Sequence, residues 1–175
     1  PLSWLWTEAE RLRNAFSRRH GLSDTRSGLA LAAITQAHHR ADLLRDASVN
    51  FVDDLRAKAE GLADRLDAAA REIFYAPDAL ALHRKTLVRA ELIEDAVAGH
   101  AALRARGESA ANAAQMAESR ARVSDALDAL EAAFDGAETR AADSLLANVE
   151  IASATAEALL APRRPKTDTT ERTAQ

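Results

Sequence analysis

Apolar residues recur at alternating intervals of three and four along most of this chain, as in helices that bury one face against other helices. The first long run covers residues 27–74. Two successive steps of four, at Phe51, Leu55 and Ala59, predict a local relaxation of the supercoil within one continuous helix. The repeating positions of this run are Ile34, Ala37, Ala41, Leu44, Ser48, Phe51, Leu55, Ala59, Leu62, Leu66, Ala69 and Ile73.

Two further helical runs follow, each after a short break. Pro77 disfavours helix at Ala76 and is tolerated in a first helical turn, so one helix is expected to end there and the next to cover 77–106. Gly107 is expected to break or kink the chain before a run over 109–160 that Ser109 opens. The apolar positions of this last run are Met116, Val123, Leu127, Leu130, Phe134, Ala137, Ala141, Leu145, Val149, Ala152, Ala156 and Leu159.

A short amphipathic segment precedes the long helices. Its apolar stripe is formed by Leu2, Leu5, Ala9, Leu12 and Phe16. Ser3 is the expected N-cap and His20-Gly21 the expected end, while Trp4 and Trp6 flank the stripe at the border of the polar face. Rings at such a border suit a surface that is apolar on one side and wet on the other, so the candidate partner-binding residues are Trp4, Leu5, Trp6, Leu12 and Phe16.

These patterns predict an all-α protein. The expected fold is an elongated antiparallel helical hairpin, or a three-helix coiled-coil bundle, with a short N-terminal amphipathic helix. The expected divisions are the amphipathic helix at 1–20, a polar connector at 21–28, the long-helix bundle at 29–161 and a polar, disordered tail at 162–175. Leu, Ile, Val and Phe make up only roughly a fifth of the chain, so alanine must let the helices approach closely around a thin core.

Composition and charge exclude several classes of function. The chain has no cysteine, which rules out disulfides and thiolate metal sites. Its net charge is −4 and residues 1–20 and 162–175 each carry +2, which leaves −8 for the middle, a poor distribution for binding nucleic acid. We find neither a membrane-spanning stretch nor a secretory signal, and expect a cytoplasmic protein, with the inner face of a membrane as the alternative site.

Candidate chemistry is sparse. Carboxylate di-iron bundles need Glu-x-x-His pairs, and no histidine here has an acidic residue three positions before it. The best ligand cluster is His38, His39 and Asp42, a weak candidate for a divalent metal beside the simpler interpretation of one histidine next to the seam and one solvated. No nucleophile, glycine-rich phosphate loop or cofactor motif can be nominated, so we expect neither enzymatic activity nor a cofactor.

Three functions remain open from the sequence. The first is a structural or interaction protein that associates with itself or with a protein partner through its helices. The second is attachment to an anionic membrane or lipid surface through the N-terminal helix. The order of its elements resembles that of PspA- and ESCRT-III-like proteins, and the composition is similar to that of the phasins of storage granules; no residue motif carries either resemblance. The third is a scaffold or assembly subunit of a bacterial or phage machine.

Overall fold

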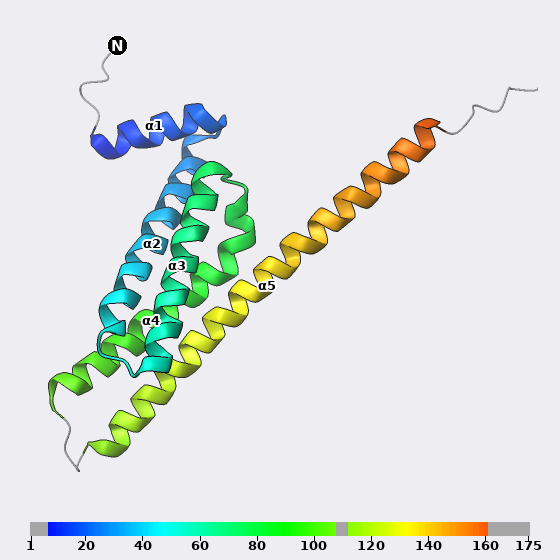
Figure 1. The fold of residues 1–175 in the computed structure, drawn as a ribbon. Helices are drawn as coiled ribbons and strands as arrows, with labels where there is room; N and C mark the ends of the chain where they lie inside the picture. The colour runs from blue at the N-terminus through cyan, green and yellow to red at the C-terminus, as the bar shows by residue number, and fades with distance from the viewer. Residues whose placement is uncertain (1–6, 108–111, 161–175) are drawn as a thin grey trace, which may run out of the picture. The chain divides into compact units, whose positions relative to one another are not determined.

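The computed structural model describes residues 7–107 and 112–160. Within these ranges the chain is all-helical, with five helices and no strand, which confirms the predicted fold class (Figure 1). The helices are α1 (Glu8–His20), α2 (Asp24–Ser48), α3 (Asp53–Tyr75), α4 (Ala79–Ala105) and α5 (Ala113–Leu160). The packing divides the chain into two units, residues 1–140 and residues 141–175, with the boundary inside α5.

Helix α1 begins later and ends where the sequence predicts. Thr7 is its N-cap, with extended backbone, and forms a capping box in which its side chain accepts from the Glu10 N–H while Glu10 accepts from the Thr7 N–H. The predicted start at Ser3 is therefore wrong for this helix, and Ser3 itself lies outside the described residues. Gly21 ends α1 in the left-handed region, with a φ of 63°, as expected of a glycine C-cap. The connector is shorter than expected, because Ser23 already caps α2.

The helix predicted over 27–74 is wrong, because the chain turns between α2 and α3 at residues 49–52. The Arg56 guanidinium donates to the carbonyl oxygens of Ser48 at 3.2 Å and Phe51 at 3.3 Å, and to that of Val49 at 3.4 Å. Arg104 from α4 donates to the Asn50 carbonyl. These bonds satisfy carbonyls that a helix end leaves without partners. The steps of four at this point thus mark a reversal of the chain.

The two later breaks follow the sequence more closely. Helix α3 ends at Tyr75 and α4 begins at Ala79, which confirms the turn predicted around Pro77. Helix α4 ends at Ala105, and Gly107 has a φ of 81°, which confirms a break there. The expected opening residue of the next helix, Ser109, lies outside the described residues, and α5 begins at Ala113.

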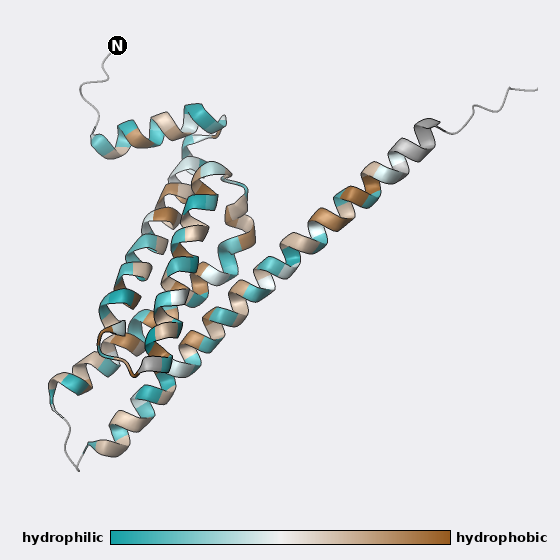
Figure 2. Cartoon of the chain, in the orientation of Figure 1, coloured by the Kyte–Doolittle hydropathy of each residue, from teal (hydrophilic) through white to brown (hydrophobic). Residues whose placement is uncertain are grey.

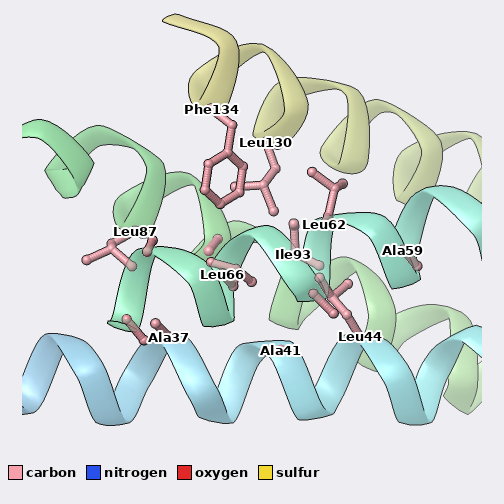
Figure 3. Close-up of a cluster of buried hydrophobic side chains, with 14 of the residues drawn as sticks. Ala37, Ala41, Leu44, Ala59, Leu62, Leu66, Leu87, Ile93, Leu130 and Phe134 are labelled. Carbon is pink, nitrogen blue, oxygen red and sulfur yellow. The ribbon is translucent and has the colours of Figure 1, made fainter. Parts of the chain in front are cut away.

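Helices α2, α3 and α4 and the first part of α5 share one core, in place of the predicted hairpin or three-helix bundle (Figure 3). The break at 49–52 supplies the additional helix. Pairs of contacts between the helices show that α2 and α3 run antiparallel, as do α4 and α5. Alanines dominate the α2 face, and larger side chains fill the space from the other three helices; the labelled core residues in Figure 3 are Ala37, Ala41, Leu44, Ala59, Leu62, Leu66, Leu87, Ile93, Leu130 and Phe134.

The second unit contains α5 from Ala141 to Leu160. No helix among the described residues has an apolar stretch long enough to cross a membrane. The tail expected at 162–175 lies outside the described residues.

Candidate functional site

The second half of α5 exposes a group of large apolar side chains. Leu145, Leu146, Val149 and Ile151 are 67%, 63%, 66% and 65% exposed, all within seven residues of one another in sequence. Figure 2 shows several brown, hydrophobic bands along the later part of α5. Scattered exposed apolar residues are common on proteins, but several that gather on one element mark an interaction site. Around the helix axis Leu145, Leu146 and Val149 lie within about 100° of one another, whereas Ile151 lies on the far side. We call Leu145, Leu146 and Val149 the α5 stripe.

The same helix shows what such a pattern does when it has a partner. In the first half of α5, Val123, Leu127, Leu130 and Phe134 are almost completely buried in the shared core. Their apolar pattern continues to Leu145 and Val149 in successive steps of four, which are expected to relax the supercoil locally. The α5 stripe therefore continues, in sequence, an interface that is already formed.

The register between α4 and α5 explains why burial ends where it does. His100 contacts Ser119, and Thr86 donates to the carbonyl oxygen of Ala133. The two contacts are 14 residues apart on both helices, so each residue nearer the N-terminus of α4 lies opposite a residue nearer the C-terminus of α5. In this register the first residue of α4, Ala79, corresponds to Arg140 on α5. Helix α4 has no further residues to pair with α5 beyond that point.

Basic residues on α3 pair with acidic residues that flank the buried part of α5. Lys58 pairs with Asp128 and, at 2.9 Å, with Glu131. Hydrogen bonds from its ammonium to these carboxylates raise the pKa of Lys58. Arg65, seven residues later, pairs in the same way with two acidic residues of α5, Asp135 at 2.9 Å and Glu138 at 2.6 Å. Acidic flanks on α5 and basic flanks on its partner thus characterise this interface.

The flank of the α5 stripe is also acidic. Residues 141–160 include Asp143, Glu150 and Glu157 and no Lys or Arg. Their spacing of seven places Asp143 and Glu150 at similar angles around the helix axis. Among the described residues, Asp143 and Glu150 form no ion pair. By analogy with the α3–α5 contact, the stripe suits a partner with an apolar surface and basic residues beside it.

A groove of about 560 Å³ lies between α2 and the start of α4. It is lined by the small residues Ala30, Ala32, Ala33 and Ala81 and by the larger apolar residues Leu22, Leu29 and Leu80. Leu29 is 60% exposed. Arg26 and Arg84 line the same groove, and Arg26 pairs with Asp78 at 3.1 Å. Small residues on a helical surface allow another helix to approach closely, so the groove can accept one.

The residues predicted to bind a surface at the N-terminus separate in the structure. Trp4, Leu5 and Trp6 lie outside the described residues. Leu12 is 54% exposed, whereas Phe16 is 3% exposed, with its ring centroid 5.8 Å from that of Phe74. Phe16 thus belongs to the core of this chain and cannot contribute to an external surface unless α1 separates from that core.

The weak metal candidate does not come together. His38 binds Asp67 on α3 at 2.6 Å, His39 lies 3.5 Å from Glu94 on α4, and Asp42 lies 3.5 Å from Arg45. The three side chains therefore engage three different partners. No group of three or more potential ligands among the described residues is placed to hold a metal ion. Burial alone would raise the pKa of Asp67, but hydrogen bonds from Arg45 and His38 outweigh it and lower that pKa.

Sequence reasoning missed the buried polar pairs, among them one between α4 and α5. His100 Nδ1 lies 2.8 Å from Ser119 Oγ, and both side chains are buried between α4 and α5. Burial, and then the nearby charges of Arg104 and Arg120, lower the pKa of His100. The backbone N–H groups around both residues lie within helices, so the pair lacks the free donors that stabilise an oxyanion. It is an interhelical hydrogen bond that helps to set the register.

No family model, no curated protein and no solved structure matches this chain.

Proposed function

We propose that this protein is a non-enzymatic interaction protein that assembles with further copies of itself through the α5 stripe. The exposure of three large apolar side chains on one face of α5 carries this proposal. Each large apolar side chain contributes about 1.5–3 kcal/mol when it becomes fully buried. An isolated helical segment of this length is marginally stable in water, so burial against another surface would also stabilise the helix itself.

The alternative of lipid attachment through the N-terminus has weaker support. Of its five candidate residues, Phe16 is committed to the core, and Leu12 is the exposed one among those described. Both tryptophans of the chain are in this segment, so intrinsic fluorescence reports it selectively. We expect the emission maximum to stay unchanged when vesicles of anionic phospholipid are added, and a blue shift would favour lipid attachment.

Three forms of the full chain test self-assembly by light scattering coupled to size exclusion, over a range of concentrations. These are the unmodified protein, the double variant Leu145→Glu with Val149→Glu, and Leu12→Glu as the matched control. All three substitutions replace exposed side chains, so circular dichroism should show unchanged helix content. We expect the mass to rise with concentration in the unmodified protein and the control, and to remain that of one chain in the double variant.

A monomeric mass for the unmodified protein at every concentration would refute the proposal. Loss of assembly in Leu12→Glu, with assembly kept in the double variant, would assign association to α1 in place of α5. Self-assembly of this kind also suits a scaffold or assembly subunit, which is a narrower form of the same proposal.

A further inference from the structure

We propose that the α5 stripe of one copy docks into the groove between α2 and α4 of a second copy. This inference rests on the proposed self-assembly and specifies the surface that receives the stripe. The groove and the stripe lie on different parts of the chain, so the contact joins two unlike surfaces.

Shape is the first argument for the groove. Four of its lining residues are alanines, and its lining residues on α2 extend from Arg26 to Gln36. At 1.5 Å per residue this side is about 15 Å long, while the segment from Leu145 to Val149 extends about 6 Å along its axis. The groove is therefore long enough for the whole α5 stripe. Its volume of about 560 Å³ also lies in the range of pockets that receive apolar groups.

Charge is the second argument, and it separates this arrangement from pairing of two α5 helices. Residues 141–160 contain three acidic residues and no basic residue, so two such segments side by side would repel each other. The groove presents Arg84, which is exposed and forms no ion pair among the described residues. Arg26 is the second cation of the groove, although Asp78 already partners it at 3.1 Å. Asp143 or Glu150 beside Arg84 would repeat the pairing seen between α3 and α5.

The exposed face of α4 is the competing receptor within a second copy. Val88 and Leu92 are 56% and 54% exposed there, with Lys85 and Arg89 beside them. This face is convex and belongs to one helix, whereas the groove offers two walls. Two walls contact more of an inserted helix, so the groove is the better receptor.

Cysteine crosslinking can identify the receptor, because the chain has no cysteine of its own. A full-length chain with Val149→Cys is mixed with an equal amount of a second, differently tagged full-length chain, and the mixture is oxidised gently. The second chain carries one of three substitutions: Leu29→Cys, Val88→Cys or Ala57→Cys. Leu29 lies in the groove and Val88 on the outer face of α4, while Ala57 on α3 is an exposed control. We expect the crosslink between the two tagged chains to form with Leu29→Cys and to exceed that of the Ala57→Cys control at least about tenfold.

Each other outcome overturns the inference in a recognisable way. A dominant crosslink between two Val149→Cys chains would assign the contact to paired α5 helices, and one to Val88→Cys would assign it to the outer face of α4. In both cases self-assembly through the stripe would stand and the groove would not. Absence of every crosslink above the control, together with a monomeric mass, would overturn the proposed function as well.

A charge exchange gives an independent readout. Arg84→Glu is expected to weaken self-association about two- to fivefold. The double variant Asp143→Arg with Glu150→Arg should weaken it to the same extent. Each of these two variants removes an exposed ion pair between copies and places like charges beside each other. The three changes together should restore association to within about twofold of the unmodified protein. Unchanged association in Arg84→Glu would contradict the docking of the stripe beside this residue.

Discussion

Replacing two leucines of α5 by alanine tests how the two halves of this helix differ. Leu130 is 0% exposed in the shared core, and Leu145 is 67% exposed on the same helix. The chemical change is identical, and leucine and alanine both favour helix, so the difference reports burial alone. Leu130→Ala removes a buried isobutyl group and leaves a cavity, which costs about 3–5 kcal/mol of unfolding free energy. Leu145→Ala should cost no more than about 0.5 kcal/mol in the monomer.

Urea unfolding followed by circular dichroism at low protein concentration measures both values. For a chain of this length the Leu130→Ala cost corresponds to a fall in melting temperature of roughly 6–20 °C. At high concentration, self-association should stabilise the unmodified protein by mass action, and Leu145→Ala should lose that gain. A cost for Leu145→Ala equal to that of Leu130→Ala at low concentration would refute this reasoning, because it would place residue 145 in the monomer core.

Three further predictions concern single positions in the first unit. Gly21 has a φ of 63°, so Gly21→Ala should cost about 1 kcal/mol in urea unfolding, whereas Gly28→Ala within α2 should be neutral or stabilising. Arg56→Gln removes the guanidinium that caps the turn at 49–52 and should cost about 1–2 kcal/mol and speed amide exchange in that turn; unchanged exchange would contradict its role. The pKa of His100 lies below its usual 6.5, through burial first and two nearby arginines second, so below about pH 6.5 the unfolded chain takes up the proton more readily. The free energy of unfolding should therefore decrease as the pH is lowered below about 6.5, by up to about 1.4 kcal/mol per pH unit. His100→Asn should reduce this dependence on pH.

Several features of the fold could be predicted from the sequence because their causes are local. Helix propensity and the scarcity of strand-forming residues determine the all-α class. Gly21 and Gly107 end helices because a positive φ costs glycine little, and Pro77 marks a turn because it restricts the residue before it. Each of these effects acts within a few residues of its origin.

The turn at 49–52 could not be predicted in the same way. The apolar positions on either side of it keep intervals of three and four, so the pattern is equally compatible with one helix. Asn50 is a weak local indication of a turn. The carbonyl of Asn50 receives a hydrogen bond from Arg104, which is more than fifty residues away in sequence. Contacts of that range exist only after the helices have packed.

The candidate site shows the same division. The sequence by itself determined that α5 has one apolar face, from Met116 through Leu145 and Val149, because helical spacing is a property of the chain. Only the tertiary structure decided which part of that face is covered, since the first residue of α4 lies opposite Arg140 in the observed register. It likewise placed Phe16 in the core and directed His38 and His39 to different helices. An apolar pattern shows that a face favours a partner, whereas the lengths and register of the neighbouring helices determine whether the chain itself supplies one.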